Sequence, residues 1–409
     1  MSSKRNRIGV MGLVGALALL AFATPAAAQE TGGNGIKVGE GRLHPYFDLE
    51  LRMDSAALYD PARGANAAEA ITHIRPGLRL DVPGNAVALG LNGYADYVWY
   101  TGLLRPGSQA ANFLGGGVDL NVAVNEKGPV GVTVSDHFVR SDRTSAVALG
   151  LGAISLYNQL AVGVPIRPGG GALEITPSGA WTVEFFQPLL GGVDCPIGDA
   201  ALCNPAVFDY QKFTGKLSTR YKFLPKTALV LDASFDAPTF RLATATASPL
   251  LLKAEAGLSG LITPKVSMLL KAGYGRDFAG TASTVVGHLE LAWLASQTAT
   301  LKAGYLRTLE PVAYYGMYGD DRAYIEGRAL FGGRLSVRAY AAYDFLSYYS
   351  LAGRNDTMTT VDVGPQYQFN PYIGAAVGYV LNNRTSSTDP NPALNYTRHE
   401  GYLRLTLSY

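Results

Sequence analysis

The sequence predicts an all-β protein, namely a single transmembrane, antiparallel, up-and-down β-barrel of about 18 strands. Three observations support this prediction. Apolar and polar residues alternate with a period of two along most of the chain, which places one set on each face of a strand. Glycine accounts for 48 of 409 residues and charged residues for only 16 %. Short and long connections alternate between the predicted strands.

The first residues have the composition of an export signal. Lys4, Arg5 and Arg7 form a positive start, an apolar run covers residues 8–22, and three alanines precede Gln29. This pattern is typical of a secretory signal peptide. We therefore assign residues 1–28 to the signal, 29–42 to a flexible periplasmic segment and 43–409 to the barrel. No later stretch reaches the ~18 consecutive apolar residues of a spanning helix, so strands must cross any membrane.

The alternation is clearest in residues 47–54, where the odd positions from Phe47 to Met53 are apolar and the even positions from Asp48 to Asp54 are charged. A helix would spread both sets around its circumference. The same pattern recurs to the end of the chain. It predicts strands at 44–54, 71–82, 86–99, 112–124, 130–139, 153–166, 172–186, 208–223, 227–236, 250–262, 265–275, 284–295, 299–308, 321–331, 334–346, 357–369, 372–382 and 395–409.

The connections between these strands fall into two classes. Joints such as Pro83–Asn85, Thr263–Pro264 and Gly332–Gly333 are short and rich in Gly and Pro. The alternate joints, such as 55–70, 187–207 and 383–394, are longer and polar. Short periplasmic turns and long extracellular loops are typical of outer-membrane barrels, and an even number of strands puts both termini on one side.

Energetics determine which face meets lipid. A slip of one residue in the strand 208–223 would turn Lys216, Arg220 and Lys222 toward lipid. Each such residue costs about 2–4 kcal/mol near the midplane. The charged face must therefore line water. Because unpaired backbone groups are costly in hydrocarbon, the sheet must also close on itself.

Two segments resemble a known family. The terminal run from Gly401 to Tyr409 (GYLRLTLSY) resembles the assembly signal of Gram-negative outer-membrane barrels, and residues 74–80 (IRPGLRL) resemble putative β-barrel porins of the second type. The resemblance implies an outer-membrane location among outer-membrane lipids and assembly by the barrel-assembly machinery through the strand ending at Tyr409. It also implies an association with polysaccharide export, with a periplasmic polysaccharide-export protein as partner. The helical-repeat periplasmic scaffold of some export barrels is missing.

Two groups of residues are candidates for lining the lumen and contacting a permeant. Four basic residues form a stripe on one predicted strand, and this stripe would attract anionic solutes or sugar acids. Further arginines and tyrosines lie on strands near the closing seam, where they offer stacking and hydrogen bonds to sugars. The alternative is that these residues are structural and pair with Glu326, Asp344 and Glu400. The candidates are Lys212, Lys216, Arg220, Lys222, Arg322, Arg328, Arg338, Arg404, Tyr324, Tyr340 and Tyr402.

The sequence offers little for other chemistry. Cys195 and Cys203 lie in a Pro- and Gly-containing segment of an exported chain, which favours a disulfide. The five histidines are scattered, so we predict no metal site and no cofactor. Asp136 and His137 are neighbours in a strand and point to opposite faces, which argues against a hydrolase triad. The net charge of +2 gives no field for nucleic acid.

These observations predict a channel rather than an enzyme. The first expectation is an exit conduit for a secreted polysaccharide. The alternative is a general or anion-leaning diffusion porin for small hydrophilic solutes. A third hypothesis is a barrel with a closed lumen whose long loops bind other cells or proteins.

Overall fold

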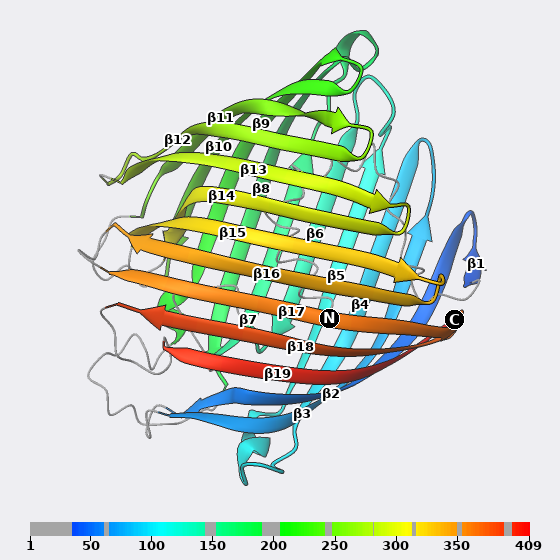
Figure 1. Ribbon diagram of the computed structural model, residues 1–409, viewed down its shortest axis with the longest axis vertical. Coiled ribbons are helices and arrows are strands. Elements are labelled where there is room, and N and C mark those ends of the chain that lie inside the picture. The colour runs from blue at the N-terminus through cyan, green and yellow to red at the C-terminus, as the bar shows by residue number, and fades with distance from the viewer. Residues whose placement is uncertain are drawn as a thin grey trace.

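The computed structural model describes residues 35–60, 65–143, 153–189, 205–241, 248–280, 282–312, 316–349, 354–387 and 395–409. They form one closed antiparallel barrel (Figure 1) in which each strand from β2 to β19 pairs with its neighbours in the chain. Pairing of β19 with β2 joins the last strand to the first, so these eighteen strands leave no edge along the wall. The predicted fold is confirmed. No helix in the described residues is long and apolar enough to span a membrane.

All eighteen predicted strands are present. In the described connections lie three short 3-10 helices: η1 (Ser108–Ala111), η2 (Pro168–Gly170) and η3 (Pro205–Phe208). The barrel strands are β2 (Gly41–Asp60), β3 (Ala65–Val82), β4 (Val87–Tyr100), β5 (Phe113–Val124), β6 (Val132–Ser141), β7 (Ala153–Gly163), β8 (Leu173–Pro188), β9 (Tyr210–Leu224), β10 (Thr227–Phe240), β11 (Leu251–Thr263), β12 (Val266–Asp277), β13 (Ser283–Ser296), β14 (Ala299–Val312), β15 (Gly316–Phe331), β16 (Leu335–Tyr348), β17 (Asn355–Asn370), β18 (Ile373–Ser386) and β19 (Tyr396–Ser408).

One strand was not predicted. Strand β1 (Ile36–Val38) folds back on β2 through a tight turn, with Ile36 opposite Leu43. It falls within the segment 29–42 that the sequence places before the barrel. The carboxy terminus lies beside it (Figure 1), because the Tyr409 amide donates to the Pro45 carbonyl at 3.0 Å. Residues 1–28, with the predicted signal, and Cys195 and Cys203 lie outside the described residues.

The two ends of the barrel differ in their connections. At the end that holds the carboxy terminus, here called the turn end, β9 and β10 are joined by two residues. Gly332 and Gly333 turn there between β15 and β16 with φ of 56° and 70°, a backbone conformation that favours glycine. At the opposite end, here called the loop end, the expected loop 55–70 is largely strand. Several inward side chains there, such as Leu58, are apolar and buried, so the alternation that marks a strand at the membrane level is lost.

The outer face is apolar. On β9, the outward side chains of Phe213, Leu217 and Tyr221 are 47–55 % exposed, while the inward Lys216 is partly buried. Tyr97 and Trp99 lie outward near the loop end, and other rings such as Phe369 lie near the turn end. Amphipathic aromatic rings settle at the two interfaces of a membrane. This outer face therefore fits lipid over the middle of the wall.

The inner face changes character toward the loop end. There Phe186, Phe240, Val312 and Leu346, from walls on both sides, pack with Phe208 of η3 into one buried apolar cluster. A second cluster joins residues of β2, β3, β4, η1 and β5, including Leu58 and Ile71, which are both fully buried. Apolar burial thus holds the loop-end mouth together, whereas the middle of the lumen is ionic.

A buried carboxylate holds the connection from β4 to β5. The Glu69 side chain is 0 % exposed and accepts hydrogen bonds from the amides of Leu104 and Arg105 at 3.2 and 3.1 Å and from the Ser108 hydroxyl at 2.7 Å. A buried carboxylate needs such donors because its desolvation is costly. Glu69 therefore fixes the segment 101–112 against the end of the wall.

Candidate functional site

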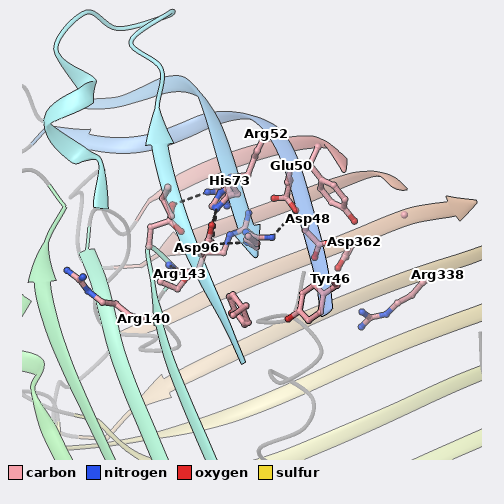
Figure 2. A pocket seen from close by; sticks show the side chains of 17 residues that line it. Tyr46, Asp48, Glu50, Arg52, His73, Asp96, Arg140, Arg143, Arg338 and Asp362 are labelled. Carbon is pink, nitrogen blue, oxygen red and sulfur yellow. Dashed lines mark hydrogen bonds and ion pairs between the residues drawn. The ribbon is translucent and has the colours of Figure 1, made fainter. Parts of the chain in front are cut away.

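A cavity of about 80 Å³ lies inside the barrel against the arc formed by β16, β17, β19, β2, β3 and β4. Tyrosines, arginines and carboxylates line it. Figure 2 shows Tyr46, Asp48, Glu50 and Asp362 grouped along one side, while Arg338 extends from β16 toward them. These residues sit on different strands and meet because alternate residues of every strand face the lumen.

Ion pairs form the wall of the cavity on β2, β3 and β4. The Arg75 guanidinium donates to Asp96 at 2.8 Å and to Glu50 at 3.3 Å. His73 Nδ1 lies 3.0 Å from the same Asp96 carboxylate, and its buried Nε2 has no hydrogen-bond partner among the described residues. Because removing one member of a buried ion pair costs about 3–5 kcal/mol, these pairs fix the shape of the wall.

A short segment after β6 leaves the wall and crosses the lumen. The Asp142 carboxylate lies 3.0 Å from Arg52 Nη2 of β2 and accepts a hydrogen bond from the Tyr100 hydroxyl at 2.9 Å. Arg143 pairs with Glu400 of β19. Strand β19 is five strands away from β6 around the wall, so these pairs bridge one side of the interior. They narrow the lumen at the level of the cavity.

The same carboxylate belongs to the closing seam. Glu400 is 1 % exposed, and Arg398 Nε lies 3.5 Å from it and 2.9 Å from Asp54 of β2. The seam and the crossing segment are therefore held by one connected ionic network. A network of buried charges is stable only when each charge has a partner of opposite sign. Arginines and carboxylates alternate through this network.

The basic stripe lies elsewhere. Lys212, Lys216 and Arg220 alternate along β9 with the outward apolar residues, and β9 is seven strands from β2 around the wall. The nearby acids are taken by other lysines: Lys271 pairs with Asp232 and Glu255 at 3.0 and 3.1 Å. Lys212 and Lys216 make no ion pair within the part of the chain that the structure describes. These two lysines therefore present positive charge to the lumen that no ion pair of the described chain holds.

A family model described as putative beta-barrel porin 2 matches residues 31–409. The chain belongs to this family. The match confirms the resemblance drawn from the sequence, and the protein is an outer-membrane β-barrel of porin type. No curated protein matches this porin in sequence.

Solved structures resemble the porin at low identity. The Pseudomonas aeruginosa protein OccK2 (OpdF), in complex with glucuronate, shares 11 % identity with a TM-score of 0.49 over 92 % of this chain and 99 % of its own. P. aeruginosa OpdK with vanillate shares 12 % identity with a TM-score of 0.47 over 90 % and 99 %. The P. aeruginosa siderophore receptor PirA shares 9 % identity with a TM-score of 0.46 over 94 % and 85 %.

The candidate residues near the porin's seam divide between the cavity and the wall. Tyr402 and Arg338 line the cavity, and Arg404 lies 4.0 Å from Glu50. The structural alternative also has support, because Arg338 and Arg328 lie 3.4 and 2.6 Å from Glu326.

Farther along the wall, Arg322 pairs with Asp344. The Tyr324 hydroxyl donates to Glu290 at 2.6 Å, and Tyr340 lies partly buried on β16. Lys222 is exposed near the turn end of β9. None of these four residues lines the cavity.

Sequence reasoning missed the residues that organise the cavity. Alternation places Glu50, Arg52 and Asp96 on the inner face, but it does not indicate that Asp142 and Arg143 leave the wall. The run of four polar and charged residues from Arg140 to Arg143, at the end of a predicted strand, is the one local signal. No group of three or more potential metal ligands occurs in the described residues.

Proposed function

We propose that this porin is a diffusion channel for small hydrophilic solutes and that it favours anions. The observation that carries the proposal is the crossing of the lumen by Asp142 and Arg143. Their pairs to Arg52 and Glu400 leave a cavity of about 80 Å³ between the crossing segment and the wall. A lumen narrowed by these pairs favours a small solute over a polymer.

The basic stripe supports the preference for anions. Lys212 and Lys216 face the lumen without ion pairs in the described chain. Positive charge along a low-dielectric wall raises the local concentration of anions. An anion that enters the lumen would therefore pass along β9 at lower electrostatic cost than a cation.

The polysaccharide conduit fits this interior less well. A growing polymer needs a continuous wide path, whereas the apolar cluster around Phe208 and Leu346 packs across the loop-end mouth. A periplasmic polysaccharide-export partner would accompany the conduit function and not the diffusion channel. Export by residues 1–28, assembly through the strand ending at Tyr409, and the absence of catalysis belong to the proposal as well.

The test is transport by the purified full-length barrel. In planar bilayers the proposal predicts ion current with a reversal potential shifted toward anions, and in liposomes it predicts faster swelling in monosaccharides than in dextran. A protein that conducts no ions, although its heat-dependent gel mobility shows that it is folded, would refute a diffusion channel. Equal passage of dextran and monosaccharide would favour the conduit.

A further inference from the structure

Tyrosines of the cavity lie across glycines of the neighbouring strands. Tyr46 of β2, Gly77 of β3 and Tyr94 of β4 are in register, and Gly117 of β5 is in register with Tyr94. A Cβ on Gly77 would lie 2.3 Å from Tyr46 Cζ, and one on Gly117 would lie 2.8 Å from Tyr94 Cε1. The phenol end of each ring therefore fills the space of a missing side chain.

The same arrangement recurs on the other side of the seam. Tyr402 of β19 is in register with Gly378 of β18, where a Cβ would lie 2.2 Å from its Cζ. Its hydroxyl reaches Gly364 of β17, where a Cβ would lie 3.0 Å away. Arg338 of β16 is in register with that glycine. Two glycine-floored aromatic patches thus face one cavity.

Three aromatic rings contribute to the lining of the cavity, and the Arg404 guanidinium lies over the Tyr402 ring, 5.9 Å from its centroid. Tyr46, Tyr94 and Tyr402 are half-buried and all line the cavity. The faces of aromatic rings carry partial negative charge and attract the slightly positive C–H bonds of an apolar surface. Around the rings, Asp48 and Asp362 supply acceptors, and Arg338 supplies donors (Figure 2).

We propose that this cavity binds a sugar ring. A pyranose presents C–H bonds on its faces and hydroxyl groups around its edge, which matches flat aromatic faces surrounded by carboxylates and a guanidinium. The mixed charges suit hydroxyl groups, which donate to Asp48 and Asp362 and accept from Arg338. This inference rests on the proposed function and names the class of solute that the channel selects.

The glycines give a sharp test. Gly77→Ala and Gly378→Ala each place a methyl group where a tyrosine ring lies, and the displaced phenol end is free to move without a change in the backbone. Gly90→Ala is the matched control on β4, since its Cβ would meet only Asn121 Cβ at 4.0 Å. Tyr402→Ala removes the aromatic ring, and Tyr402→Phe retains the ring without its hydroxyl.

The measurement is block of ion current in planar bilayers by glucose, galactose, maltose, glucuronate and N-acetylglucosamine, with benzoate as a planar aromatic probe. Binding of the same probes to the detergent-solubilised barrel is followed by tyrosine fluorescence. We expect at least one sugar to bind. Its half-saturating concentration should rise about three- to tenfold in Gly77→Ala, Gly378→Ala and Tyr402→Ala, and stay unchanged in Gly90→Ala and Tyr402→Phe.

The outcomes separate the two proposals. Current that no sugar blocks, with no sugar binding in detergent, would overturn the sugar site and leave the channel standing. If benzoate blocks the current and no sugar does, the cavity binds aromatic acids, and the proposed sugar site is overturned. Sugar binding in detergent without any current would support the site and refute the channel. Unchanged affinity in all three disrupting variants would show that the rings do not form the site.

Discussion

Substitution of Leu217 by arginine tests the assignment of the two faces. Leu217 lies seven residues from each end of β9, so it sits near the middle of the wall, and its outward side chain is 47 % exposed. Its neighbour Lys216 points into the lumen and makes no ion pair with the described residues. The two adjacent positions therefore differ in what surrounds them and in little else.

The expected magnitude follows from the depth of the site. Arginine on the lipid face costs about 2–4 kcal/mol at the midplane, which corresponds to a loss of about 30- to 900-fold in the folding equilibrium constant. Lys216→Leu removes a charge from the aqueous face and should change the free energy of unfolding by less than about 1 kcal/mol. Leu217→Arg should therefore be much the more damaging of the two.

The assay is urea unfolding in lipid vesicles, followed by the fluorescence of Trp99, Trp181 and Trp293, which are all exposed on the wall. Heat-dependent gel mobility reports the folded fraction independently. Equal losses for Leu217→Arg and Lys216→Leu would contradict the assignment of faces, and with it the view that lipid surrounds this side of β9.

Three further predictions follow from other parts of the wall. Replacing Lys216 and Arg220 by glutamate should move the reversal potential toward cation selectivity with the fold retained, and an unchanged potential would show that β9 does not line the conducting path. Arg143→Ala should raise single-channel conductance because it releases the crossing segment from β19, whereas Arg143→Lys should not; equal conductance in all three proteins would rule out a constriction there. Glu69→Gln replaces the carboxylate that holds the segment 101–112 by a neutral amide, so thermolysin should cut beside Leu103 faster than in the parent. An unchanged cleavage rate would argue that Glu69 does not control this segment.

The strands are predictable because lipid and water impose opposite requirements on alternate residues. Where this contrast weakens, prediction fails. Residues 55–60 and 65–70 continue β2 and β3, but Leu58 faces the apolar cluster at the loop end and Ile71 lies in the same cluster. The alternation that marks the membrane level is lost there, so the sequence alone ends β2 too early and begins β3 too late. Strand β15 begins at Gly316, five residues before its predicted start, beside the buried Met317 for the same reason.

The candidate site is only partly predictable because a period of two gives the face and not the register. Alternation places Tyr402 and Arg338 inward, and both line the cavity. The pairing of Tyr402 with Gly378 depends on the offset between neighbouring strands, which is set by turn geometry. The contact of Arg143 with Glu400 joins residues 257 positions apart and depends on where the chain leaves the wall after β6.

The seam between β2 and β19 sets the order in which this barrel can be built. Every other pairing of the wall joins strands adjacent in the chain, so each hairpin can form and add to the sheet in sequence order. Asp54 meets Arg398 across 344 residues, a closure whose entropic cost for a free chain is about 5 kcal/mol. Until the last fourteen residues pair with β2, the sheet has two edge strands with unpaired backbone groups. A chain that stops short of Tyr396 lacks β19 and leaves β2 without the neighbour that closes the barrel.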